Sequence, residues 1–203
     1  PAALHRAAEA KTGERRLPAA LGDLTPRFVL YLSSDPRPGD QVERWLPQLQ
    51  RVGRPFLVVT RSVEMLEHVA ALCVRHGLVV PVVHRPTLRS LDDVVAPSLT
   101  TAFYVTNGAR NSHFVERRGL THVWLHGSES DEPAAFSPVH AIYDLIVVSD
   151  PGTAEGYRRH GVHIPTQKFL VTGTDPDGFV EAARSVVDRR PATAGAASGE
   201  GTA

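Results

Sequence analysis

Short apolar runs alternate with amphipathic segments through most of the chain. The runs are rich in Val, Leu, Phe and Ile and are bounded by Gly, Pro, Asn and Asp, a pattern typical of buried strands. Between them, apolar side chains recur every three or four residues, which predicts helices. We expect strands at 27–32, 55–60, 78–83, 101–105, 121–127, 145–148 and 169–172. We expect helices between 40 and 53, between 62 and 77, and at 88–94, 111–118, 138–143, 153–160 and 179–188.

This alternation predicts an α/β fold: a Rossmann-like, doubly wound, mostly parallel sheet with helices on both faces. Pro81 lies inside one run and favours an edge strand there, since proline cannot donate to a sheet ladder. We assign residues 26–189 to this domain. Residues 1–25 are rich in Ala, Arg and Glu and suit a helical or flexible linker, whereas 190–203 have the composition of a disordered tail.

The overall charge narrows the classes of partner. Lys and Arg total 22, as do Asp and Glu, so no bulk attraction to nucleic acid or to an anionic membrane is implied. The single cysteine, Cys73, excludes an internal disulfide and suits a reducing, cytoplasmic compartment. No apolar run is long enough for a transmembrane segment. Because the chain begins at Pro1 rather than Met, we interpret it as a piece of a longer protein.

The first candidate site is the end of the run at 121–127. Strand alternation places His122, Trp124 and His126 on one face. Ligands of open α/β sheets lie past the carboxyl ends of the strands, where His126 falls, and Gly127 lacks a Cβ that would hinder a substrate. We interpret His122 as a core histidine, and for His126 a substrate-facing role and a core role stay equally open. On a strand these two histidines are about 13 Å apart, too far to share an ion, so no metal is predicted.

Polar segments beside two strand ends supply further candidates. Asp131, in the acidic loop after Gly127, could orient the His126 imidazole, whereas Glu129 and Glu132 suit a solvated loop. The segment 107–113 offers backbone N–H groups, a guanidinium and amides to an anionic or phosphate-bearing ligand, but it lacks the Lys-Ser/Thr ending of a nucleotide P-loop. A plain strand–turn–helix connection explains it equally well. Its candidate ligand contacts are Asn107, Arg110 and Asn111.

Several motifs together resemble the CDP-glycerol glycerophosphotransferases of teichoic-acid synthesis, most closely actinobacterial members that follow membrane helices. The resemblance covers roughly residues 26–180. It is carried by Arg27-Phe28-Val29-Leu30-Tyr31, Trp45-Leu46-Pro47, Gly53-Arg54-Pro55-Phe56, Thr121-His122-Val123, Leu125-His126-Gly127, Ser130-Asp131, Pro133, Ser137-Pro138-Val139, Tyr143-Asp144, Tyr157, His160-Gly161-Val162-His163-Ile164-Pro165 and Lys168-Phe169.

The resemblance implies the amino-terminal half of a two-domain GT-B fold. Such an enzyme moves glycerol phosphate from CDP-glycerol to a cell-envelope polymer, a polyol phosphate or a lipid-linked acceptor, at the inner face of the cell membrane. It implies that His126 is the catalytic base toward the acceptor hydroxyl, that Asp131 is its possible orienter, and that Gly127 and Ser130 bind substrate. No cofactor or nucleic acid is implied. Because the half that holds CDP-glycerol is missing, the isolated chain is predicted to be inactive.

Two departures from the family pattern leave alternatives open. Glu132 stands where members carry a basic residue, and Thr174-Asp175 stand in a motif that is Gly-Arg-Pro in the family. Both changes remove positive charge that would help to hold phosphates. The alternative function is therefore a catalytically degenerate Rossmann-like domain that binds an envelope polymer or a partner protein. A third, weaker hypothesis is a stand-alone nucleotide binder.

Overall fold

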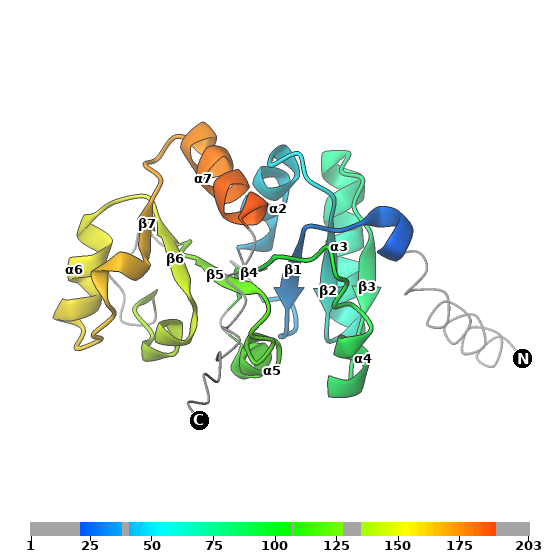
Figure 1. The fold of residues 1–203 in the computed structure, drawn as a ribbon, viewed down its shortest axis with the longest axis horizontal. Coiled ribbons are helices and arrows are strands. Elements are labelled where there is room, and N and C mark those ends of the chain that lie inside the picture. Colours follow the sequence, from blue (N-terminus) through cyan, green and yellow to red (C-terminus); the bar gives the residue numbers. More distant parts are fainter. Residues whose placement is uncertain (1–20, 38–40, 107, 128–134, 190–203) are drawn as a thin grey trace, which may run out of the picture.

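The computed structural model describes residues 21–37, 41–106, 108–127 and 135–189. In this part of the chain all strands join one parallel sheet of seven strands, in the order β3-β2-β1-β4-β5-β6-β7 (Figure 1). The strands are β1 (Phe28–Leu32), β2 (Phe56–Thr60), β3 (Val82–His84), β4 (Thr101–Tyr104), β5 (Thr121–Leu125), β6 (Leu145–Val148) and β7 (Phe169–Val171).

Helices connect successive strands. They are α2 (Val42–Arg51), α3 (Val63–His76), α4 (Leu88–Asp92), α5 (Ser112–Val115), α6 (Gly152–Arg159) and α7 (Pro176–Asp188), with short 3-10 helices η1 (Ala109–Asn111), η3 (Pro138–Ile142) and η4 (Thr166–Lys168). The chain winds outward from β1 to β3 and then in the other direction from β4 to β7. This is the doubly wound, Rossmann-like arrangement, so the predicted fold class is confirmed.

The two faces of the sheet are covered by different helices. Helices α2, α3 and α7 pack on one face, whereas α4, α5, α6 and η3 pack on the other (Figure 1). Along β5, Val123 and Leu125 join the first core and Trp124 joins the second, as the alternation predicted. Each face therefore has its own apolar core, and the sheet is buried between them.

Local sequence signals explain where most elements begin and end. The Ser62 hydroxyl accepts a hydrogen bond from the Met65 amide at the start of α3, and Gly77 ends this helix with φ = 62°, a left-handed conformation that glycine adopts at little cost. Pro81 precedes β3, which is shorter than the predicted strand and lies at the sheet edge. Helix α7 begins at Pro176, three residues earlier than predicted, because proline suits a first helical turn.

Other predicted segments differ from the structure or lie outside it. In place of the helix predicted at 111–118, the structure has η1, which begins two residues earlier, and the short α5, which ends at Val115. Within the predicted linker, residues 21–24 are helical and Leu21 packs in the core. The rest of that linker and the predicted tail at 190–203 lie outside the described residues.

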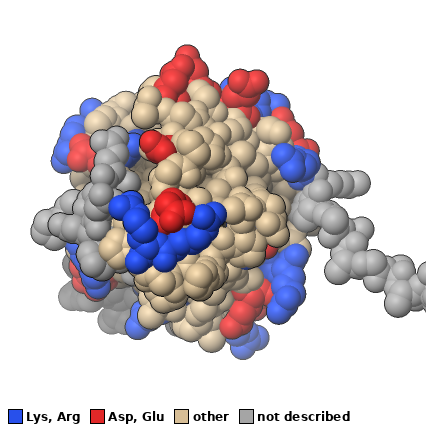
Figure 2. All heavy atoms as spheres, turned by 90° about the vertical axis from the view of Figure 1, so that its left-hand side faces the viewer, with Lys and Arg blue, Asp and Glu red and all other residues tan. Residues whose placement is uncertain are grey.

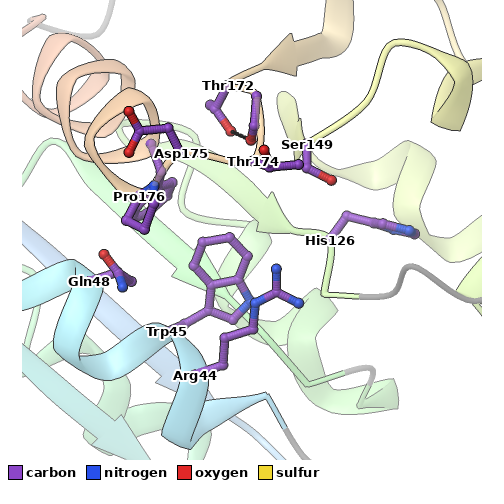
Figure 3. A pocket seen from close by; sticks show the side chains of 11 residues that line it. Arg44, Trp45, Gln48, His126, Ser149, Thr172, Thr174, Asp175 and Pro176 are labelled. Carbon is purple, nitrogen blue, oxygen red and sulfur yellow. Dashed lines mark hydrogen bonds between the residues drawn. The ribbon is translucent and has the colours of Figure 1, made fainter.

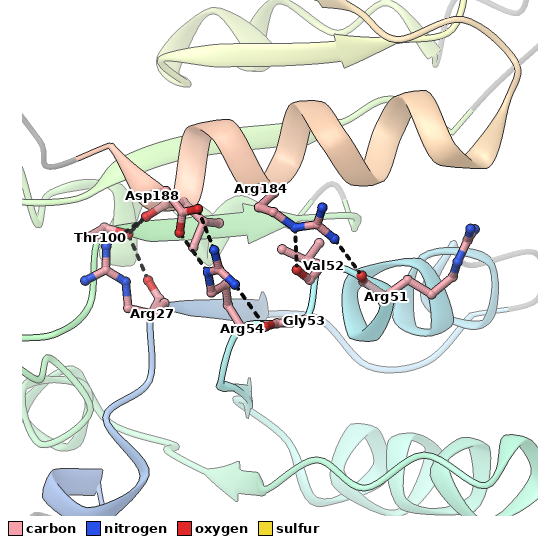
Figure 4. A network of polar contacts seen from close by, with 9 residues as sticks. Arg27, Arg51, Val52, Gly53, Arg54, Thr100, Arg184 and Asp188 are labelled. Carbon is pink, nitrogen blue, oxygen red and sulfur yellow. Dashed lines mark hydrogen bonds and ion pairs between the residues drawn. The ribbon is translucent and has the colours of Figure 1, made fainter.

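Helix α7 returns across the sheet and fastens its carboxyl-terminal end to β1 and β4 (Figure 4). The Val187 carbonyl accepts hydrogen bonds from the Thr100 hydroxyl at 2.7 Å and from Arg27 Nη2 at 3.2 Å. Beside it, the Arg54 guanidinium binds both carboxylate oxygens of Asp188 at 2.8 Å, which lowers the pKa of that carboxyl. The helix is thus anchored at the edge of the sheet opposite to its own first turn.

Candidate functional site

A cleft of about 100 Å³ lies at the carboxyl ends of β5, β6 and β7, beside α2 and the first turns of α7 (Figure 3). This edge is where ligands bind in open α/β sheets. The residues that line it are Arg44, Trp45, Gln48, His126, Ser149, Thr172, Gly173, Thr174, Asp175, Pro176 and Phe179.

His126 forms part of the cleft wall because it directly follows β5. Its backbone N–H donates to the Val147 carbonyl at 3.1 Å, so the pairing with β6 continues past the strand. The residue is 8% exposed and belongs to the cleft wall, but Figure 3 shows its imidazole directed away from the other lining side chains, and its Nε2 is buried. The residue therefore contributes to the cleft wall, whereas its imidazole packs beside Phe136 and Tyr157, each with ring centroids 5.8 Å away.

A buried tyrosine links His126 to a second histidine. The Tyr157 hydroxyl, on α6, lies 3.3 Å from His126 Nδ1 and 2.6 Å from His140 Nδ1 on η3. Trp124 stacks on the His140 ring with centroids 4.3 Å apart. The three polar groups form a chain, His126–Tyr157–His140, that runs from the cleft into the protein.

Burial controls the protonation of this chain. It lowers the pKa of His140 to about 3, with repulsion from His126 adding to the effect, so His140 is neutral at neutral pH. Burial also raises the pKa of Tyr157, which therefore keeps its proton. Tyr157 has one hydroxyl proton and two imidazole neighbours. It can therefore donate a hydrogen bond to only one ring and must accept one from the other.

The opposite wall of the cleft comes from α2. Arg44 Nη1 donates to the Gly127 carbonyl at 2.8 Å, and the Arg44 guanidinium lies 5.3 Å from the centre of the Trp45 ring. A Cβ at Gly127 would lie closer than 3.0 Å to the Gln41 side chain. The space before Gly127 is thus filled by the flexible Gln41 side chain, which would have to move to make room for a Cβ.

Trp45 presents a buried polar atom at the cleft. The residue is 7% exposed, and its Nε1 has no hydrogen-bond partner among the described residues. Its ring packs on Phe179 of α7 with centroids 4.8 Å apart, and Figure 3 shows the indole between Arg44 and Pro176. An unpaired buried donor is costly, so a hydrogen-bond acceptor on a ligand would relieve that cost.

The amino-terminal end of α7 is already capped by its own chain. Asp175 Oδ1 accepts from the Asp177 amide at 3.0 Å, and the Asp175 carbonyl accepts from the Gly178 amide at 3.1 Å. Among the described lining residues, Arg44 is the one Lys or Arg side chain. The cleft therefore provides mixed polar groups and one cation, rather than a strongly basic phosphate site.

The residues predicted after β4 lie elsewhere. Asn111 is 0% exposed: its Nδ2 donates to the Thr106 carbonyl and the Tyr143 hydroxyl, both at 2.8 Å, and its Oδ1 accepts from the Ser33 hydroxyl at 2.6 Å. Its amide holds the loops after β1 and β4 together. Arg110 is exposed and, like Asn111, is absent from the described cleft lining.

Three predicted site residues, Asn107, Ser130 and Asp131, lie outside the described residues, so the roles expected for them stay predictions. Conversely, sequence reasoning did not identify Tyr157 and His140 as partners of His126, or Arg44 as a cleft residue. Tyr157 carried a signal, because it belongs to the motifs that resemble the transferase family.

The described residues show neither a metal site nor a membrane-spanning helix. They contain no group of three or more His, Cys, Asp or Glu side chains arranged to hold a metal ion. None of their helices has both the length and the apolar character needed to cross a bilayer. The side of the molecule seen in Figure 2 carries charges of both signs among broad uncharged areas, in keeping with the balanced composition.

The fold and the cleft define a Rossmann-like α/β domain with a candidate site at the carboxyl edge of its sheet. No protein-family model and no curated protein matches the sequence. Among solved structures, the chain is similar to HepE from Anabaena, crystallised in complex with UDP, with a TM-score of 0.47 and 15% sequence identity. The likeness covers 71% of this chain and 43% of the HepE chain, so this chain spans less than half of that protein.

Proposed function

We propose that the chain is the acceptor-side domain of a glycerophosphotransferase-like enzyme of the GT-B type, in which His126 is the base that takes a proton from an acceptor hydroxyl. The observation that carries this proposal is the position of His126: the residue lines a cleft at the carboxyl edge of the sheet, and its Nδ1 lies 3.3 Å from a buried tyrosine hydroxyl. The His-Gly resemblance to CDP-glycerol glycerophosphotransferases independently supports the same residue.

The hydrogen-bond chain supports the base role through the tautomer of His126. The shorter contact favours donation by the Tyr157 hydroxyl to the neutral His140 ring. Tyr157 then accepts from the N–H at His126 Nδ1, which leaves His126 Nε2 without hydrogen. This atom is buried, so the ring must turn toward the cleft to take a proton from an acceptor. Tyr157 and His140 are positioning residues in this scheme, because they act on the acceptor only through His126.

The proposed reaction follows from that tautomer. The acceptor hydroxyl gives its proton to His126 Nε2, and its oxygen bonds to the phosphorus of the glycerol phosphate group. The bond between that phosphorus and the oxygen of CMP breaks, so CMP leaves with the electron pair. Donor and acceptor must be held in line, and we therefore expect a second domain to hold CDP-glycerol.

The size and lining of the cleft support a small hydroxyl-bearing acceptor end. Its volume of about 100 Å³ is below the roughly 300–1,000 Å³ of sites that enclose drug-sized ligands. Ser149, Thr172 and Thr174 provide hydroxyl groups, and Trp45 provides an apolar ring. These groups match a polyol end better than a nucleoside diphosphate.

The proposal is tested by transfer assays on the full-length enzyme that contains this chain. His126→Gln should lower the transfer of labelled glycerol phosphate from CDP-glycerol to a polyol-phosphate acceptor by about 10²- to 10⁴-fold, the usual effect of a general base. The matched control is His163→Gln, at an exposed histidine. An unchanged transfer rate in His126→Gln would exclude the base role, and turnover of CDP-glycerol by the isolated chain would exclude the need for a second domain.

A catalytically degenerate domain that binds an envelope polymer or a partner protein is the second candidate. It is favoured by Asp175, whose carboxylate lies in the cleft wall and would repel a phosphate, and by the single lining cation, Arg44. For this function, the full-length protein should transfer no glycerol phosphate, and calorimetry should show polymer binding that His126→Gln leaves intact.

A further inference from the structure

Two arginines lie side by side at the carboxyl edge of the sheet, away from the His126 cleft. Arg61 follows β2 and Arg85 follows β3, and the Arg85 amide donates to the Thr60 carbonyl at 2.8 Å, which continues the pairing of these strands. Neighbouring strands are about 5 Å apart, so the two residues are adjacent. Both are buried, with Arg61 7% and Arg85 5% exposed.

Few of their guanidinium N–H groups have a protein partner. Arg61 Nη1 donates to the Tyr31 hydroxyl at 3.2 Å, and its Nη2 donates to the Pro86 carbonyl at 2.7 Å. Arg85 Nη1 donates to the His84 carbonyl at 3.0 Å. Each guanidinium has five N–H donors, and both Nε atoms are buried without a hydrogen-bond partner among the residues that the structure describes. Within the described residues, neither arginine has an ion pair with a carboxylate.

This arrangement is unfavourable without a ligand. Removing a cation from water is costly unless an opposite charge compensates it, and two adjacent cations repel each other. The three acceptors are neutral carbonyl and hydroxyl oxygens, which satisfy some hydrogen bonds but supply no negative charge. An anion that accepts several hydrogen bonds would compensate both charges.

A third arginine reaches the same corner through Tyr31. The Tyr31 hydroxyl accepts from Arg61 and lies 3.4 Å from the Arg110 carbonyl, to which it can donate. Tyr31 is held by stacking on Phe114, with ring centroids 4.7 Å apart. This places the backbone of the exposed Arg110 beside Tyr31, and the Arg110 charge acts on the Tyr31 hydroxyl, at the point between β1 and β4 where the winding of the sheet reverses. Such switch points are ligand sites in open α/β sheets.

We propose that Arg61 and Arg85, with Arg110 at the rim, form a binding site for a phosphate group. Guanidinium forks match the oxygens of phosphate in bidentate geometry, and the unpaired N–H groups offer several such bonds. Strands β2 and β5 are separated by β1 and β4, which puts this phosphate site about 14 Å from the His126 cleft. The proposal does not depend on the proposed transferase function.

The test is a titration of the full chain with inorganic phosphate and with glycerol 3-phosphate, at constant ionic strength against chloride. Calorimetry should show saturable binding, and the thermal unfolding midpoint should rise with ligand concentration. Tighter binding of glycerol 3-phosphate would identify an organic phosphate as the ligand, whereas equal binding would identify free phosphate. Absence of saturable binding of either ligand would overturn the proposal.

Variants assign the binding to these residues. Arg61→Met and Arg85→Met should each weaken phosphate binding by at least about tenfold, the loss of one charge-assisted hydrogen bond. Without phosphate, neither variant should unfold at a lower temperature than the original chain, since an uncompensated buried charge has been removed. The control is Arg75→Met, at an exposed arginine paired with Glu43.

If a buried variant fails to fold, the rim residue provides the decisive measurement. Arg110→Met changes an exposed side chain and should still weaken phosphate binding severalfold, and binding should weaken as salt is raised. Phosphate binding that is unchanged in Arg110→Met, and also in whichever buried variants fold, would place the anion elsewhere and overturn the proposal.

Discussion

Acidification should destabilise the protein through His140. Its side chain is 1% exposed, stacks on Trp124 and bonds to Tyr157, and burial lowers its pKa to about 3. In the unfolded chain the pKa of a histidine is near 6.5. The folded pKa is below the unfolded one, so the unfolded state binds the extra proton between these values. The contribution of His140 is therefore complete above about pH 6.5 and is lost as the pH falls toward 3.

The magnitude follows from that difference in pKa. Each pH unit below the unfolded pKa costs about 1.4 kcal/mol, so a change from about pH 7.5 to about pH 5 lowers the free energy of unfolding by about 2 kcal/mol. That is a large share of the roughly 5–15 kcal/mol typical of a domain. Burial also lowers the pKa of His122, which adds an effect of the same sign.

Urea denaturation of the original chain and of His140→Gln at both pH values measures this contribution. The Gln variant should be less stable near neutral pH, and its free energy of unfolding should change by about 2 kcal/mol less between the two pH values. His163→Gln, at an exposed histidine, should retain the original pH dependence. Equal pH dependence in His140→Gln and the original chain would refute the reasoning.

Two glycines provide further predictions. Gly156→Ala on α6 should lower the free energy of unfolding by about 1–3 kcal/mol despite the better helix propensity of alanine, because the new Cβ would lie closer than 3.0 Å to the buried Phe136 ring. Gly178→Ala should lower the unfolding midpoint and disturb the cleft wall, since its Cβ would approach the Thr172 carbonyl equally closely. Gly119→Ala is the control for both variants. A Cβ at Gly119 would have no described atom within 4 Å apart from its chain neighbours, so thermal unfolding should show little change.

Much of the fold followed from the sequence because the relevant signals are local. The apolar runs and the helical periodicity between them determine a parallel sheet with helices on both faces, and β5 shows the predicted alternation of Val123, Trp124 and Leu125. The ends of elements were less well predicted. Helix α7 begins at Pro176 because the Asp175 side chain caps it. Several neighbouring residues could cap a helix, and only the folded backbone shows which of them does.

The candidate site was predictable only in part. Placing His126 at the end of a strand required local reasoning alone. Its link to Tyr157 and His140 depends on how α6 and η3 pack, and no sequence spacing expresses that packing. Asn111 was predicted to contact a ligand, but its amide cross-links two loops instead. An amide in a strand–helix turn can do either, and the sequence does not distinguish the two roles.

The return of α7 across the sheet has a consequence during synthesis. Val187 bonds to Arg27 across 160 positions of sequence, and Phe179 covers Trp45 on α2. The ribosome must therefore release α7 before the nascent chain can bury the outer side of α2. Until then, this apolar surface is open to chaperones or to other chains, so translation that stops near residue 175 should yield an aggregation-prone product.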